Sequence, residues 1–254
     1  MKLNAFLFIV FFLIALLSCG SRQVVTVPLE PDIQFETAME YFKAGKYDKA
    51  IPLFEKILFY HPSSEYVDDA QYWLGKAYFE KKDYNQAIIE FDYLIKNFTT
   101  SKFIEDAYFY RAKSYLNKAP GYEKDPTETE NAITLFDQFL TKFPGSKYID
   151  EVKKSILSAR NRLAKKELEN GKLYIKLGEK DAALLYFNYV MENYPETDAS
   201  NEAKYLAATL YEKKGMTEEA LNLYKALMEE EEWKERVKER IERINQKDQQ
   251  SVNE

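Results

Sequence analysis

The sequence contains little cysteine, histidine, glycine or proline. Its 254 residues include one cysteine, one histidine, eight glycines and eight prolines. A single cysteine excludes a disulfide within the chain, and it also excludes a zinc site built on thiolates. Because glycine and proline are scarce and runs of valine or threonine are few, the composition favours helices over sheet.

The chain also has no excess of basic residues. Its 36 lysines and arginines are outnumbered by 42 aspartates and glutamates, which gives a formal net charge of −6. A general nucleic-acid partner would require a basic face. We therefore expect no nucleic-acid partner.

Nothing in the sequence is typical of an active site. It has no glycine-rich phosphate loop, and its sole histidine, His61, adjoins Pro62, where helix capping or packing accounts for it. No second histidine or further thiol accompanies His61 as a metal ligand. We expect a protein without catalytic activity, metal or cofactor.

The longest apolar run lies at the N-terminus. Lys2 precedes the uncharged apolar stretch 5–17, and Ser18-Cys19-Gly20 follows. A basic residue, a short apolar run and a small residue before the cut are typical of a secretory signal peptide. The run is short for a membrane span, which needs roughly 20 apolar residues. An uncleaved anchor, or an ordinary signal peptide followed by an unmodified cysteine, is the alternative.

Residues 18–20 resemble the lipobox of bacterial lipoproteins. The resemblance implies that cleavage leaves Cys19 as an acylated first residue, which tethers the protein to a lipid bilayer. Each buried CH₂ of an acyl chain contributes ~0.8 kcal/mol to membrane binding, and a single chain binds only marginally. A stable anchor therefore needs two or more chains. Gly20 is not the aspartate that favours retention in the inner membrane of enterobacteria, so the resemblance implies the outer membrane.

Five segments of the chain share one pattern, in which an alanine is followed four residues later by a large aromatic residue. The pairs are Ala50 and Phe54, Ala87 and Phe91, Ala132 and Phe136, Ala183 and Phe187, and Ala220 and Tyr224. The alanines are spaced by 37, 45, 51 and 37 residues. Internal periodicity of this length predicts a stack of helical hairpins.

The first unit indicates how each hairpin is built. Apolar residues recur at helical spacing over 35–42 and again over 50–58. Gly45 separates the two helices because glycine accepts the left-handed conformation that ends a helix. Pro62 ends the second helix because proline cannot continue the hydrogen-bond ladder. The second unit has Thr99 where proline is expected, which predicts a less abrupt end.

These positions resemble the tetratricopeptide repeat. Six residues of the first unit match the family's small, aromatic, turn and helix-ending positions: Ala38, Tyr41, Gly45, Ala50, Phe54 and Pro62. The third unit contains an insertion, 117–129, and residues 149–163 predict an extra amphipathic helix before the fourth unit. We expect an all-α tetratricopeptide-repeat solenoid of about five helical hairpins. The expected parts are a signal peptide (1–18), a lipidated N-terminus and linker (19–32), the solenoid (33–245) and a disordered tail (246–254).

The loops between repeats restrict the resemblance to a smaller group of tetratricopeptide-repeat proteins. HPSSEYVDDA, FTTSKFIEDA and FPGSKYIDEV share a serine, an aromatic residue and an acid in register. Together with five repeats, the insertion and the lipobox, they resemble the BamD family of outer-membrane lipoproteins. The resemblance implies a scaffold and receptor for unfolded outer-membrane proteins, with a BamA-like barrel subunit as partner. The alternative is a periplasmic organiser of envelope or cell-division complexes of the Tol–Pal-associated type.

The first helices of repeats one to three predict a client-peptide groove. Its members are Phe35, Met39, Phe42, Tyr72, Lys76, Phe79, Phe109, Lys113 and Leu116. Large apolar groups on one face of a repeat array are typical of a binding surface. The resemblance implies that this groove accepts the C-terminal signal of an unfolded outer-membrane protein. Its aromatic residue would pack on the rings, and its carboxylate would meet Lys76 or Lys113.

Overall fold

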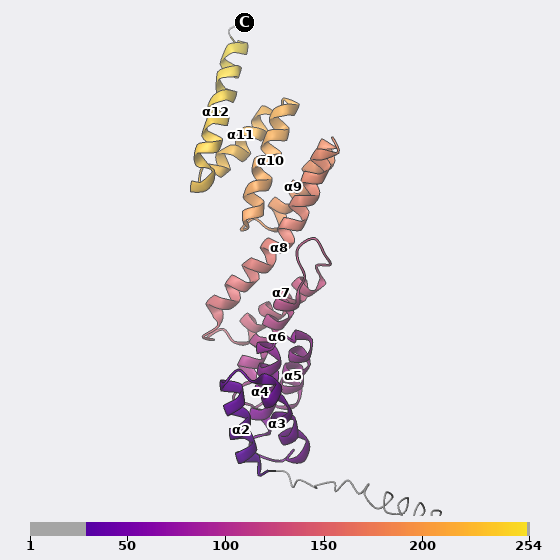
Figure 1. Ribbon diagram of the computed structural model, residues 1–254. Helices are drawn as coiled ribbons and strands as arrows, with labels where there is room; N and C mark the ends of the chain where they lie inside the picture. Colours follow the sequence, from indigo (N-terminus) through magenta and orange to yellow (C-terminus); the bar gives the residue numbers. More distant parts are fainter. Residues whose placement is uncertain (1–28, 253–254) are drawn as a thin grey trace, which may run out of the picture.

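The computed structural model describes residues 29–252, with side chains over 29–246. The predicted signal peptide, Cys19 and most of the linker lie outside the described residues. Every regular element in the described range is a helix, and successive helices stack into an elongated rod (Figure 1). The first hairpin lies at one end of the rod and α12 lies at the other.

The helices alternate between a first and a second helix of each repeat. The first helices are α2 (Pro31–Lys43), α4 (Val67–Glu80), α6 (Ile104–Lys118), α8 (Ile149–Lys176) and α10 (Asp198–Lys214). The second helices are α3 (Tyr47–Tyr60), α5 (Tyr84–Asn97), α7 (Thr127–Lys142), α9 (Lys180–Asn193) and α11 (Thr217–Leu227). Each helix packs mainly on its neighbours in sequence, as in a solenoid. The predicted fold of five helical hairpins is confirmed.

Each hairpin closes around a small residue of its first helix and the aromatic residue of its second. A Cβ atom added at Gly75 would lie 2.8 Å from Cε1 of Phe91, and one added at Gly171 would lie 2.5 Å from Cε1 of Phe187. The equivalent positions of the other first helices hold fully buried alanines: Ala38, Ala112 and Ala208. The five predicted alanine–aromatic pairs are also fully buried. The sequence pattern therefore marks the contact on which each hairpin depends.

The helix ends follow the expected chemistry with one exception. Gly45, which follows the C-cap residue Ala44 of α2, takes a φ of +70°, as expected for a glycine at a helix end. His61 ends α3 with a φ of −129°, and Phe98 ends α5 with a φ of −123°. The prediction of a less abrupt end near Thr99 is therefore wrong, because the turn at Phe98 matches the turn that precedes Pro62.

The long helix α8 joins the predicted extra helix to the first helix of repeat four. No proline interrupts its 28 residues. Val152 and Ile156 in its first half pack with the cluster of repeat three, whereas Ala164 and Leu168 in its second half pack with the cluster around Phe187. Residues 149–163 are therefore not a separate helix but the first half of one helix that two repeats share.

The last helix, α12 (Glu231–Val252), covers the fifth hairpin. Val237 is fully buried and Ile244 is nearly so, in a cluster with Tyr224. The helix continues into the segment 246–254, for which the sequence predicts a disordered tail. It does so because no glycine or proline occurs between residues 231 and 252 to end it.

We predict that Gly171→Ala destabilises the fold by ~1–3 kcal/mol, since the new methyl group overlaps the buried ring of Phe187. The matched control is Gly145→Ala, because a Cβ there meets nothing within 4 Å. Thermal unfolding followed by circular dichroism measures both variants. Equal midpoints for the two variants would contradict the close contact in repeat four.

Candidate functional site

The structure covers two rings of the predicted groove with aromatic residues of the following loops. Tyr72 stacks on Phe103 with ring centroids 4.2 Å apart, and Phe109 stacks on Tyr148 with centroids 4.0 Å apart. Tyr72 is 6% exposed and Phe109 is 1% exposed. Both rings therefore join successive repeats and do not line an open groove, which corrects the prediction for these two residues.

The two lysines of the predicted groove already have partners inside the chain. Lys76 is buried, its Nζ donates to Glu80 Oε1 at 2.8 Å, and it lies 3.7 Å from the ring centroid of Tyr110. Lys113 pairs with Glu151 of α8 and lies over the ring of Phe109. Neither ammonium group is free to bind the carboxylate of a peptide, because each already forms an ion pair with a glutamate and a cation–π contact with an aromatic ring.

The other predicted members are only partly covered. Phe35, Met39 and Phe42 of α2 are half-buried beside the core of repeat one. Phe79 packs edge-on against the ring of Tyr110 at 5.2 Å. Leu116 is half-buried against the core of repeat three. Because Tyr72, Phe109 and Lys76 are buried, the accessible part of the predicted groove consists of these partly exposed side chains and Lys113.

The shared loop pattern has a structural role that the sequence did not reveal. Ser101 Oγ donates to Asp68 Oδ2 at 2.7 Å, and Ser146 Oγ donates to Glu105 Oε1 at 2.5 Å. In each case the serine of one loop holds an acid in the first turn of the preceding first helix. The regular spacing of serine and acid is the signal from which this contact could have been found.

Tyr148 strengthens the same junction. Its hydroxyl donates to Asp106, and its ring stacks on Phe109. Burial and this hydrogen bond raise the pKa of Tyr148 above its ordinary value, so the phenol stays protonated at physiological pH. The junction between repeats three and four is thus closed by stacking and by a charge-assisted hydrogen bond.

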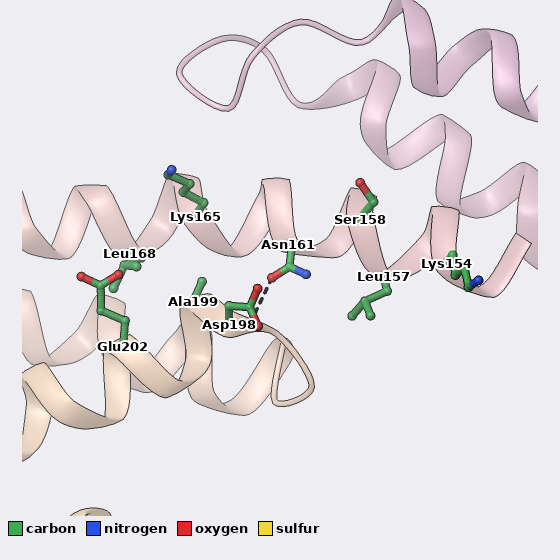
Figure 2. A pocket seen from close by; sticks show the side chains of 9 residues that line it. All are labelled: Lys154, Leu157, Ser158, Asn161, Lys165, Leu168, Asp198, Ala199 and Glu202. Atoms are coloured by element: carbon green, nitrogen blue, oxygen red, sulfur yellow. Dashed lines mark hydrogen bonds between the residues drawn. The ribbon is translucent and has the colours of Figure 1, made fainter. Parts of the chain in front are cut away.

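A cleft of about 520 Å³ lies between α8 and the start of α10 (Figure 2). Leu157, which is 40% exposed, provides apolar surface along α8, and buried Leu168 lies at the floor of the cleft. Asn161 Oδ1 accepts a hydrogen bond from the backbone N–H of Asp198 at 3.1 Å, which holds the first turn of α10 against α8. Sequence reasoning missed this cleft, since it depends on how α10 returns to the middle of α8.

The cleft carries charges of both signs. Lys154 and Lys165 stand on α8, while Asp198 and Glu202 stand on α10. Glu202 is already paired with Lys172 at 2.7 Å. An apolar strip between opposite charges suits a protein segment with a matching charge pattern better than a small anion.

The insertion of repeat three packs on the middle of α8. Arg162 Nη1 donates to the carbonyl oxygens of Ala119 and Pro120 at 3.3 and 3.4 Å. Lys166 Nζ donates to the carbonyl oxygen of Lys124 at 3.0 Å. The loop therefore supports α8 where the helix changes from one repeat to the next.

The described residues contain no group of three or more His, Cys, Asp or Glu side chains placed to hold a metal ion. His61 follows the last residue of α3, and its Nε2 lies within hydrogen-bond distance, 3.0 Å, of the carbonyl oxygen of Leu29. This placement agrees with the capping and packing role expected for it. Between residues 29 and 252, no helix is both long enough and apolar enough to cross a membrane.

A model of the YfiO family, described as an outer membrane lipoprotein, matches residues 30–226. The chain belongs to the YfiO family. The match begins one residue before α2 and ends at the penultimate residue of α11, so it covers all five hairpins of this YfiO member.

Curated relatives of this YfiO chain are named outer membrane protein assembly factor BamD. The protein of Vibrio cholerae is 25% identical over 107 residues, which are 42% of this chain and 44% of the relative. The protein of Rickettsia prowazekii is 33% identical over 96 residues, which are 38% of each chain. The matched segments therefore span less than half the length of these relatives.

A solved structure agrees with the fold of this YfiO chain. The TPR2AB domain of yeast Sti1, in its complex with pHSP90, superposes with a TM-score of 0.50 and 15% identity. The likeness covers 88% of this chain and 86% of the Sti1 chain. It shows the repeat architecture alone.

We predict that Arg162→Ala combined with Lys166→Ala releases the insertion from α8. Each lost hydrogen bond contributes ~1 kcal/mol, and 1 kcal/mol changes an opening equilibrium about fivefold. Limited proteolysis should therefore cut residues 119–126 faster than in the parent. Lys154→Ala is the control, because Lys154 lies on α8 outside this contact. Unchanged cleavage in the double variant would mean that the loop is held by other contacts.

Proposed function

We propose that this protein is an outer-membrane-anchored periplasmic lipoprotein of the β-barrel assembly complex. It acts there as a scaffold and as a receptor for unfolded outer-membrane proteins. The observation that carries the proposal is the YfiO family match over all five repeats, together with relatives named as outer membrane protein assembly factors. A repeat array with an extended surface is suited to binding several proteins at once.

The anchor in this proposal is acylated Cys19. The lipobox-like residues 18–20 supply the site, and the family description names a lipoprotein. Acyl chains on a single cysteine hold a protein at a bilayer surface without a spanning helix.

A BamA-like barrel subunit is the proposed structural partner, bound mainly by the later repeats. The cleft between α8 and α10 supports this placement, because it combines exposed Leu157 with lysines on one wall and carboxylates on the other. Charges at the rim of an apolar patch set the orientation of a partner more than its affinity.

Client proteins are proposed to bind the accessible remainder of the predicted groove. Phe35, Met39 and Phe42 offer apolar edges on α2, and Lys113 on α6 has a side chain that is 30% exposed. A carboxylate would have to compete with Glu151 for Lys113. Recognition therefore rests more on the rings than on the lysines.

The alternative is a periplasmic organiser of the Tol–Pal-associated type, which would use the same repeats without clients. The proposed short linker between Cys19 and the first repeat favours the assembly complex, because the alternative family places a coiled-coil segment before its repeats. Only nine residues, 20–28, lie between positions 19 and 29.

Site-specific photo-cross-linking in intact cells tests the proposed partners. A cross-linker at Leu157 is expected to capture a barrel subunit with soluble domains, and one at Met39 is expected to capture unfolded outer-membrane proteins. Exposed Gln138 on α7 is the control position. Tol–Pal components in place of a barrel subunit at Leu157 would replace the proposal with the alternative.

The anchor has its own test. We predict that metabolic labelling with a fatty acid marks the parent protein and not Cys19→Ala, since the thiol is the proposed acylation site. Label in the Cys19→Ala variant would refute the lipid anchor and leave the repeat fold untouched.

A further inference from the structure

Four large apolar side chains stand exposed at the end of the rod formed by α2 and α3. We call Leu29, Ile33, Phe59 and Tyr60 the tip patch. Leu29 and Ile33 are each 50% exposed, Tyr60 is 52% exposed, and Phe59, at 76%, is the most exposed large apolar side chain in the described part of the chain. Clustered apolar exposure of this kind marks an interaction surface, whereas single exposed residues do not.

The four residues of the tip patch come from the same end of the α2–α3 hairpin, because α2 and α3 are antiparallel. The first turn of α2 lies beside the last turn of α3, and His61 Nε2 approaches the carbonyl oxygen of Leu29 to 3.0 Å. Pro31 and Tyr60 line the same hollow, and Phe59 meets Tyr60 edge-on with ring centroids 4.9 Å apart. The two rings therefore form an aromatic pair at the end of α3, in the hairpin that lies at the end of the rod opposite α12 (Figure 1).

Packing within the repeats does not account for the patch. The core of repeat one is completed by Phe54 and Ile57, both fully buried, and neither Phe59 nor Tyr60 belongs to that cluster. A solenoid requires a polar outer face where its array ends. The last hairpin follows this rule through α12, whereas the first hairpin ends in exposed aromatic rings.

The position of the patch relative to the proposed anchor identifies its occupant. Cys19 is ten residues before Leu29, and ten residues span at most ~36 Å when fully extended. An acylated Cys19 therefore keeps the tip patch within that distance of the bilayer. We propose that the tip patch is a second membrane contact, in which Phe59 and Tyr60 enter the interface between headgroups and acyl chains. The proposal rests on the lipid anchor proposed above.

The charged side chains around the tip patch indicate which lipid headgroups it would favour. Glu30, Asp32 and Glu65 line the hollow beside Tyr60. These carboxylates repel an anionic surface, and they can accept hydrogen bonds from the ammonium group of a zwitterionic phosphatidylethanolamine. Aromatic rings with one polar edge, such as Tyr60, favour the headgroup level of a bilayer. The expected occupant is therefore a zwitterionic bilayer surface.

A spin label next to the patch tests the contact in the full, acylated protein. Ser63→Cys places the label in the exposed loop that lines the same hollow, and acylated Cys19 has no free thiol. The protein is reconstituted into phosphatidylethanolamine and phosphatidylcholine vesicles, and collision with a water-soluble nickel chelate is measured. We expect collision to fall roughly tenfold on reconstitution, as for a side chain that partitions into the membrane.

Two matched variants decide which residues cause the protection. Phe59→Ser with Tyr60→Ser should restore collision at position 63. Ile89→Ser with Tyr93→Ser, which removes a comparably exposed pair from α5, should not. Replacing part of the phosphatidylcholine with anionic phosphatidylglycerol should also raise collision.

The outcomes separate the tip contact from the anchor. An acylated protein that floats with vesicles while its label stays in water overturns the tip contact alone. Protection that survives loss of Phe59 and Tyr60 overturns the role of these rings. Mass spectrometry of the same sample reports acylation, and an unacylated protein that does not float overturns the anchor together with the contact that depends on it.

Discussion

Each hairpin of this protein depends on a glycine or alanine in its first helix, which lets the aromatic ring of its second helix pack closely. Where Gly75 faces Phe91 and Gly171 faces Phe187, the ring occupies the place that a Cβ would need. The two helices can approach closely only because one position is small and the opposite position is large and flat. The same requirement explains why alanine stands at the equivalent positions of the other repeats.

Successive hairpins are joined by a different interaction, and it uses the loops. At two junctions a ring of the loop stacks on a ring of the preceding first helix, Phe103 on Tyr72 and Tyr148 on Phe109. In the same two loops a serine donates a hydrogen bond to an acid of that helix. The loop pattern seen in the sequence therefore joins repeats two and three and repeats three and four of the solenoid. Because these groups are used internally, the surface left for partners is smaller than the number of aromatic residues implies.

The sequence predicts the repeats well because their contacts lie within one hairpin. Ala87 and Phe91 are four residues apart, so their register is visible without a structure. The predicted groove depends on contacts between hairpins, and Tyr72 is hidden by Phe103, which is 31 residues away. The α8–α10 cleft also depends on tertiary placement, since Leu157 and Asp198 share a surface only after α10 has returned to α8. Local pattern fixes which residues form a helix, whereas the exposure of each helix face is decided by its neighbours.

The long helix α8 has a mechanical consequence for an assembly that holds partners at both ends of the rod. Its 28 residues form a stiff strut about 42 Å long, which is shared by two repeats and braced at its middle by the insertion of repeat three. Because α8 is unbroken from Ile149 to Lys176, no loop lies between repeats three and four at which they could hinge. The distance between a protein bound to the last repeats and a bilayer touched by the first hairpin would therefore stay nearly constant.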